Sequence, residues 1–190
     1  MEKILVNCLT RLLSKNKQVY EHSLRVGNMA RRMASYLNFD EQQTRKFVIG
    51  CCIHDVGKIL LPDGILDKSA PLNKEEWKMM KIHPLLGTKL ILKEGILDQD
   101  VVDIVRFHHE RWDGQGYPFG ISGDKIPSMA RMCSIIDAFD SMISDRPYRR
   151  GMSMQEAKEE LWRHIGTQFD LLYVERFLHL LEDLSSPLEQ

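Results

Sequence analysis

The stretch DEQQTRKFVIGCCIHDVGK, residues 40–58, decides how the chain around it folds. Asp40 is of a residue type that caps helix N-termini, and almost every residue in 47–53 is apolar. We therefore expect a helix that begins after Asp40 and ends with that apolar run. The pair His54-Asp55 follows directly, and a segment without helical pattern comes after it. The predicted helix thus carries two chemically active side chains at its C-terminal end.

Outward from this stretch, apolar residues recur at three- and four-residue spacing along nearly the whole chain, and the alternation typical of strands is scarce. Pro84 and Pro127 suit the first turns of helices. The chain is therefore predicted to be all-α, with helices at residues 3–14, 19–37, 41–53, 74–81, 84–93, 98–109, 127–143, 153–165 and 171–184. Irregular segments are expected at residues 57–73 and 113–125, and the second of these contains four glycines.

The composition is that of one globular domain. The 190 residues are 43% hydrophobic and 28% charged, which is enough to bury a core, so we expect a single domain over residues 1–190. A net charge of −1 argues against a surface that binds nucleic-acid polymers. No apolar run is long enough for a membrane span or a signal peptide. The four cysteines lack C-x-x-C spacing, which favours free thiols and a cytoplasmic location.

Five of the seven histidines stand in contexts that suggest a metal site. They are His22, His54, His83, His108 and His109. Two of these contexts are adjacent pairs, His54-Asp55 and His108-His109. Because neighbours on a helix project about 100° apart, we expect such a pair to serve two ions, or to bridge them, rather than to grip one ion. The set favours a two-metal site over a single tetrahedral zinc site.

The ligand types also narrow the choice of metal. Imidazole and carboxylate groups without a thiolate favour iron, manganese, zinc or nickel. Each histidine taken alone is more often a surface or core residue than a ligand, so the interpretation rests on the five together. His164 and His179 lie in C-terminal amphipathic segments and are interpreted as structural.

The order of these residues resembles the HD superfamily of metal-dependent phosphohydrolases. The elements that carry the resemblance are His22, His54-Asp55-Val-Gly-Lys58, His83-Pro, His108-His109 and Asp137. The stretch HHERWDGQGYP, residues 108–118, resembles the signature of the HD-GYP subfamily, as do IPSMARMCSIIDAFDSMISDRPYR, residues 126–149, and GTQFD, residues 166–170. The resemblance covers residues 18–181. It implies an all-α HD-domain bundle with a binuclear metal site in its core.

The resemblance also implies a ligand set. One metal would be held by His22, His54, Asp55 and Asp137, and the second by His83, His108 and His109, with Asp55 bridging the two. Iron or manganese is expected, with zinc or nickel as alternatives, and the two ions would polarise a phosphodiester and activate a water. Some similar proteins have a glutamate four residues before the first histidine as a ligand for a third metal. Here that position is Gln18, which favours a binuclear centre.

The implied activity is hydrolysis of cyclic di-GMP to linear pGpG, and from there to GMP. Asp55, Lys58 and Asp140 would be catalytic, with Lys58 and Asp140 near the phosphate or the bound water. Tyr117 would stack on or hydrogen-bond to a guanine. Arg146 and Arg149 would clamp the phosphates, although the same RPYR segment is also typical of a helix terminator.

Other interpretations stay open. Cyclic GMP-AMP is an alternative substrate, and a nucleotidase or (p)ppGpp hydrolase is an alternative enzyme of the same superfamily. A weakly active cyclic-dinucleotide receptor or docking domain is the alternative that is not an enzyme. A sensory or receiver domain, or a diguanylate cyclase, would be a regulatory partner, and the chain could dimerise.

Overall fold

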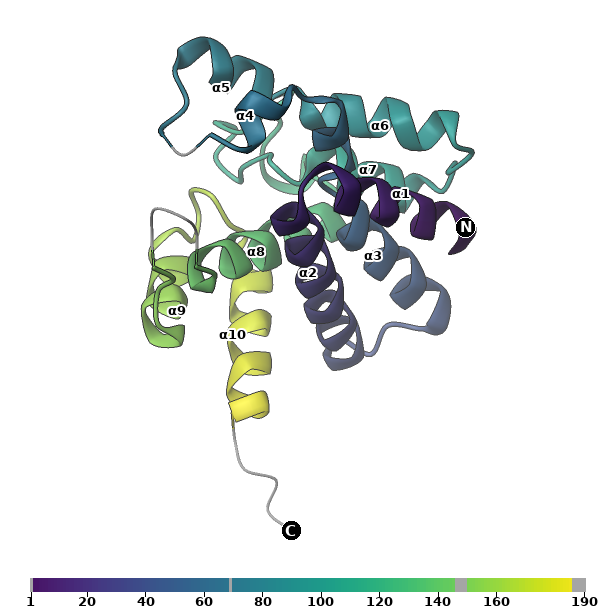
Figure 1. Ribbon diagram of the computed structural model, residues 1–190. Helices are drawn as coiled ribbons and strands as arrows, with labels where there is room; N and C mark the ends of the chain where they lie inside the picture. Colours follow the sequence, from purple (N-terminus) through teal and green to yellow (C-terminus); the bar gives the residue numbers. More distant parts are fainter. Residues whose placement is uncertain (1, 69, 146–149, 186–190) are drawn as a thin grey trace.

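The computed structural model describes residues 2–68, 70–145 and 150–185, which form a bundle of helices (Figure 1). Within these residues the strand-type pairing is one isolated bridge between Ile165 and Phe169. The all-α prediction is confirmed. The longer helices are α1 (Glu2–Lys15), α2 (Lys17–Tyr36), α3 (Glu41–Ile53), α5 (Lys74–Met80), α6 (His83–Lys93), α7 (Gln99–Phe107), α8 (Ser128–Ile143), α9 (Met154–Arg163) and α10 (Leu171–Ser185).

Some details of the predicted helix pattern were wrong. Residues 57–73 are not irregular throughout, because a 3₁₀ helix (Val56–Leu60) and the short α4 (Asp63–Leu66) interrupt them. The helix expected over residues 98–109 ends at Phe107. There the chain turns, and the N–H of Glu110 donates to the carbonyl oxygen of Phe107 at 2.8 Å.

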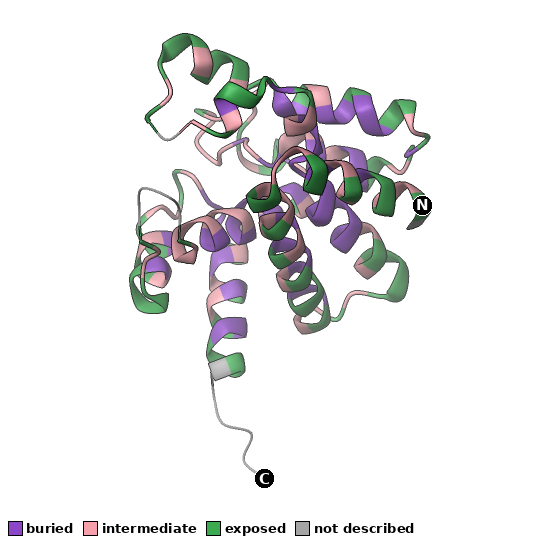
Figure 2. Ribbon diagram, viewed as in Figure 1, coloured by how far each residue is buried: buried purple, intermediate pink, exposed green. Residues whose placement is uncertain are grey.

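The C-terminal half of α3 forms the centre of the core. Every residue from Phe47 to Ile53 is buried, and α3 packs against α1, α2 and α7. Figure 2 shows the inner surfaces of these helices buried and their outer surfaces exposed. At the start of α3, the Asp40 carboxylate accepts from the N–H of Gln43 at 2.7 Å, and the Gln43 side chain accepts from the N–H of Asp40 at 3.0 Å. This capping box fixes where α3 begins.

Gly57 sets how the segment after α3 meets α6. A Cβ atom at this position would lie 1.9 Å from the carbonyl oxygen of His83 and 2.5 Å from the backbone nitrogen of Gly87. Only glycine permits two backbone segments to approach so closely. The 3₁₀ helix therefore lies directly on the start of α6, which brings Asp55 beside His83.

The C-terminal helices complete the bundle on one side of α2. In Figure 1, α8, α9 and α10 lie together there, and α8 packs against both α2 and α7. All four cysteines are buried and free, and the described residues contain no disulfide. Among the helices of the described residues, none is long and apolar enough to cross a membrane.

Candidate metal centre

Side chains from five helices or their ends converge into two groups that can each hold a metal ion. Within each group the candidate ligand atoms lie within 4.8 Å of one another. The groups are His22, His54 and Asp137, and Asp55, His83, His108 and His109. These are the residues expected as metal ligands from the sequence, and the structure brings all of them together.

Three of the histidines are oriented by backbone carbonyl groups. Each Nδ1 atom lies near the carbonyl oxygen three residues earlier, at 2.7 Å for His54, 2.8 Å for His83 and 3.1 Å for His108. A carbonyl oxygen can only accept, so each Nδ1 carries the hydrogen and donates. Each Nε2 therefore keeps its lone pair for the site, which is the tautomer that metal binding at Nε2 requires.

His22, in contrast, is held by two carboxylates of α8. Its Nδ1 lies 2.7 Å from Oδ2 of Asp140, and its Nε2 lies 2.9 Å from Oδ1 of Asp137. The two aspartates are three residues apart and so share one face of α8. An ionised carboxylate only accepts, so Nδ1 donates to Asp140. Nε2 faces Asp137, and a metal ion in this group would take the place of a proton between the two atoms.

The histidine Nε2 atoms meet in pairs across the site. They are 3.3 Å apart for His22 and His54, and 3.2 Å apart for His83 and His108. Two lone pairs that face each other repel unless a proton or a cation lies between them. Together with the carboxylates, this donor set fits a divalent transition metal with nitrogen and oxygen ligands.

Asp55 stands between the two groups. Its Oδ2 lies 3.5 Å from Nε2 of His54, and its Oδ1 lies 3.1 Å from Nε2 of His83. Oδ1 is buried and has no hydrogen-bond partner within the described part of the chain, because His83 already donates from Nδ1. A buried carboxylate oxygen without a donor is costly unless a cation binds it. The position of Asp55 fits a carboxylate that bridges two ions.

Charges and burial separate the pKa values of these groups. Burial would raise the pKa of Asp55, but the ammonium of Lys58, 2.5 Å from Oδ2, lowers it well below its usual range. Burial lowers the pKa of His108 well below normal and that of His109 to about 3, and neighbouring rings add to the effect. His108 and His109 are therefore neutral at pH 7, the form of imidazole that binds a metal.

The adjacent pair His108-His109 corrects one expectation. Neighbouring residues were expected to face two ions because a helix was assumed to run through both. Since α7 ends at Phe107, the two ring centroids lie 4.2 Å apart and both rings belong to the same group. The pair His54-Asp55 is divided between the groups, as expected.

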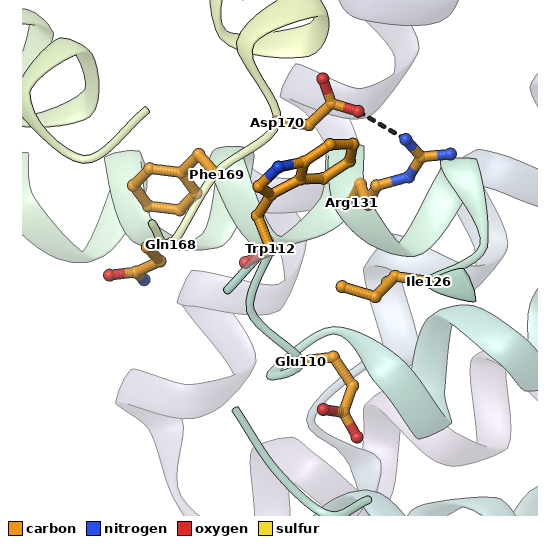
Figure 3. A pocket seen from close by; sticks show the side chains of 8 residues that line it. Glu110, Trp112, Ile126, Arg131, Gln168, Phe169 and Asp170 are labelled. Carbon is orange, nitrogen blue, oxygen red and sulfur yellow. Dashed lines mark hydrogen bonds and ion pairs between the residues drawn. The ribbon is translucent and has the colours of Figure 1, made fainter. Parts of the chain in front are cut away.

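The glycine-rich loop after α7 is held by hydrogen bonds to the turn 166–170. The N–H groups of Trp112 and Asp113 donate to carbonyl oxygens in the turn 166–170, at 3.2 and 2.8 Å. Arg131 lies 5.5 Å from the Trp112 ring centroid and forms an ion pair with Asp170 at 2.5 Å (Figure 3). Trp112, Arg131 and Asp170 are among the residues that line a small pocket (Figure 3). The GTQFD turn thus supports the loop that carries Tyr117.

Two residues of the site were not predicted from the sequence. Glu110 is buried, and its Oε1 accepts from the N–H of Phe119 at 2.7 Å, which ties the loop to the second metal group. The sequence feature that could have indicated Glu110 is its position directly after two candidate ligands, His108 and His109. Arg25 pairs with Asp140 from one helical turn beyond His22. Nothing in the sequence indicated which acid Arg25 would meet.

Of the residues predicted to contact the substrate, the structure describes Tyr117, Lys58 and Asp140. Tyr117 has its ring centroid 4.7 Å from that of His109, beside the second group. Lys58 contacts Asp55, and its side chain is 20% exposed. The carboxylate of Asp140 is directed at His22 and Arg25. The predicted phosphate clamp, Arg146 and Arg149, lies outside the described residues.

Comparison with known proteins agrees with this geometry. A model of the HD domain family matches residues 7–171. A cyclic di-GMP phosphodiesterase of Pseudomonas aeruginosa is 36% identical over 149 residues, which cover 78% of this chain and 36% of that protein. The 3′3′-cGAMP-specific phosphodiesterase 2 of Vibrio cholerae is 30% identical over 178 residues, which cover 93% of this chain and 34% of that protein. The chain thus spans about a third of the length of these relatives.

A solved structure shows the same fold. It is described as an HDG"Y"P protein from Bdellovibrio bacteriovorus and has a TM-score of 0.70 at 23% identity, covering 88% of this chain and 53% of that one. Proteins of the HD domain family are metal-dependent, in agreement with the His/Asp cluster found here. The chain belongs to the HD domain family, as its resemblance to the HD superfamily implied.

Proposed function

We propose that this chain is a metal-dependent phosphodiesterase that hydrolyses a cyclic dinucleotide, with cyclic di-GMP as the first candidate. The products would be linear pGpG and, after a second cleavage, GMP. The observation that carries the proposal is the pair of neighbouring His/Asp groups between which Asp55 divides its two oxygens. The printed activities of the Pseudomonas and Vibrio relatives support the substrate class.

The two groups would hold two divalent ions, iron or manganese in the first instance, with zinc or nickel as alternatives. Such ions polarise a phosphodiester and lower the pKa of a bound water to near neutrality. The chain itself fixes the donor atoms, because the Nδ1–H bonds of the histidines hold each Nε2 toward the site. Lys58 lies at the edge of the cluster, where its ammonium can contact a phosphate oxygen.

Tyr117 would recognise the base. Its ring lies beside His109, and the ammonium of Lys81 lies 5.5 Å from its centroid. An aromatic face next to the ligand groups suits a purine held while its phosphodiester is cleaved. Arg146 and Arg149 are proposed as phosphate contacts on chemical grounds alone. Asp140 is kept as a site residue, and its contacts favour a role through His22 over direct contact with substrate.

A second candidate substrate is 3′3′-cGAMP, which the name of the Vibrio relative favours. It differs from cyclic di-GMP in one base, and stacking on the Tyr117 ring suits either purine. A panel therefore has to include both dinucleotides.

The decisive test is turnover of a substrate panel. Protein purified without oxygen and loaded with Mn²⁺ or Fe²⁺ would be given cyclic di-GMP, 3′3′-cGAMP, (p)ppGpp, a nucleoside monophosphate and bis(p-nitrophenyl) phosphate. We expect cleavage of a cyclic dinucleotide to the linear product. Cleavage of (p)ppGpp or the monophosphate instead would favour another HD-type phosphohydrolase. Tight binding of a cyclic dinucleotide without turnover would favour a receptor.

A regulatory partner is also proposed. The relatives extend far beyond the matched region, which supports control by a sensory or receiver domain or by a diguanylate cyclase. Measurement of turnover with and without such a domain on the same chain would test this.

We expect two metal ions per chain in protein loaded with Mn²⁺. The carboxylate that would hold a third ion is replaced by Gln18, which is exposed on α2 one turn before His22. The change Gln18→Glu supplies that carboxylate and should raise the uptake toward three ions, measured by metal analysis after gel filtration. Gln42→Glu, an equally exposed glutamine on α3, is the control. Three ions in the unaltered protein, or one, would contradict the prediction.

Tyr117→Ala should impair hydrolysis of the dinucleotide more than that of a small diester. Stacking of a base on an aromatic side chain contributes about 1–3 kcal/mol, so kcat/KM for cyclic di-GMP should fall by about 5- to 150-fold. Bis(p-nitrophenyl) phosphate has no purine and should be cleaved nearly as before. Phe119→Ala, an exposed aromatic in the same loop, is the control. Equal losses on both substrates would mean that the Tyr117 ring supports the metal groups and not the base.

A further inference from the structure

Arg25, Asp140 and His22 form a continuous chain of charge-assisted hydrogen bonds from the protein surface to the metal groups. The Nε and Nη2 atoms of Arg25 lie 2.7 and 2.9 Å from the two carboxylate oxygens of Asp140. Oδ2 of Asp140 lies 2.7 Å from Nδ1 of His22. The side chain of Arg25 is 47% exposed, whereas that of Asp140 is 9% exposed. This series of hydrogen bonds therefore joins α2 to α8, which pack against each other.

The position of His22 within its helix explains why it needs this support. His54 and His108 cap the C-terminal ends of α3 and α7, where backbone carbonyl groups are free to accept. His83 is the first residue of α6, and its Nδ1 reaches back to the carbonyl group of Met80, the last residue of α5. His22 lies in the interior of α2, where the carbonyl groups are used by the helix itself. It must therefore take its acceptor from a side chain, and Asp140 supplies it.

A carboxylate alone is a poor orienting group because it can rotate about its terminal bond. The guanidinium of Arg25 contacts both oxygens of Asp140 as a planar fork, which fixes the plane of the carboxylate. With that plane fixed, Oδ2 faces Nδ1 of His22, and Nε2 of His22 faces His54 and Asp137.

We propose that Arg25 is a positioning residue for the metal group His22–His54–Asp137, acting through Asp140 on the ring of His22. Among the described residues, the hydrogen bonds of the Arg25 side chain go to Asp140 and not to a metal-ligand residue. The second group, in which the rings of His83 and His108 are held by backbone carbonyls, does not depend on it. The inference rests on the metal-dependent function proposed above but not on the identity of the substrate.

The test is metal binding to Arg25→Gln protein, measured without substrate. Equilibrium dialysis against Mn²⁺ with metal analysis gives the affinity for each ion, and electron paramagnetic resonance distinguishes an isolated Mn²⁺ from a coupled pair. Loss of an outer partner of a metal ligand costs roughly 10- to 100-fold in affinity. Arg25→Gln leaves that partner, Asp140, in place and removes only the group that orients it, so this factor is the upper bound. We expect the affinity for one ion to fall by up to that factor and the affinity for the other ion to be retained, with the spectrum of an isolated ion at intermediate Mn²⁺ concentration.

Two further variants sharpen the test. Arg32→Gln removes the same charge from an exposed arginine two turns further along α2 and should bind both ions as the unaltered protein does. Arg25→Lys keeps the charge but not the planar fork, and should fall between the unaltered protein and Arg25→Gln.

Several results would overturn the inference. Equal weakening of both ions, with a lower Tm of the metal-free protein, would show that Arg25 only holds α2 to α8. Unchanged binding of both ions with a raised KM for the dinucleotide would make Arg25 a substrate contact. Binding of fewer than two ions by the unaltered protein would reject the proposed metal centre and this inference with it. Two ions bound equally well by unaltered and Arg25→Gln protein would reject the inference alone.

Discussion

Asparagine in place of Asp55 is expected to remove metal-dependent hydrolysis and to weaken the binding of both ions, while the chain still folds. Asn keeps the size of the side chain and loses the charge that lies between the two groups. Loss of an outer partner of a metal ligand costs roughly 10- to 100-fold. Asp55 contacts both groups directly, so we expect the loss of hydrolysis to exceed about 100-fold.

Thermal unfolding separates the loss of metal from the loss of fold. A ligand present at 100 times its Kd stabilises the folded state by about 2.7 kcal/mol, so Mn²⁺ should raise the Tm of the unaltered protein. The Tm of Asp55→Asn should respond little to Mn²⁺ over the same range. Asp183→Asn, which removes an exposed carboxylate on α10, should behave as the unaltered protein. Binding of both ions by Asp55→Asn with unchanged affinity would reject Asp55 as a bridge.

The helices could be predicted from the sequence because their signals are local. Asp40 and Gln43 form the capping box at the start of α3, and an apolar run marks its buried half. The candidate ligands could be named because they occur together as an ordered set along the sequence. The wrong boundary at Phe107 has a local cause as well, since a turn formed by one backbone hydrogen bond leaves no mark in the apolar spacing.

The individual contacts of the site could not be predicted from local patterns, because they join residues far apart in the sequence. Arg25 meets Asp140 at a separation of 115 residues, and no pattern in either segment indicates the other. His83 meets His108 across two helices for the same reason. The division of the ligands into two groups was implied only by the HD resemblance, and it results from such contacts. The sequence shows a glycine at position 57, but it does not indicate that the backbone of α6 lies against this glycine.

Gly57→Ala is therefore expected to damage both stability and the metal site. The added Cβ would lie 1.9 Å from the carbonyl oxygen of His83, and neither partner is a flexible side chain that could move aside. The 3₁₀ helix must then move away from α6. Overpacking of this kind costs about 1–3 kcal/mol, and at about 2–4 °C per kcal/mol for a chain of this size the Tm should fall by about 2–12 °C.

The same movement separates Asp55 from His83. In the unaltered protein, Oδ1 of Asp55 lies 3.1 Å from Nε2 of His83. The folded fraction of Gly57→Ala should therefore bind Mn²⁺ more weakly at the second group than the unaltered protein does, which dialysis below the lowered Tm would measure. Gly64→Ala is the matched control, because a Cβ on that α4 residue meets nothing within 4 Å. Alanine there should leave metal binding unchanged and stabilise the chain by about 0.4–1 kcal/mol. If Gly57→Ala were as stable as Gly64→Ala and bound both ions, the close contact between the 3₁₀ helix and α6 would not be what holds Asp55 beside His83.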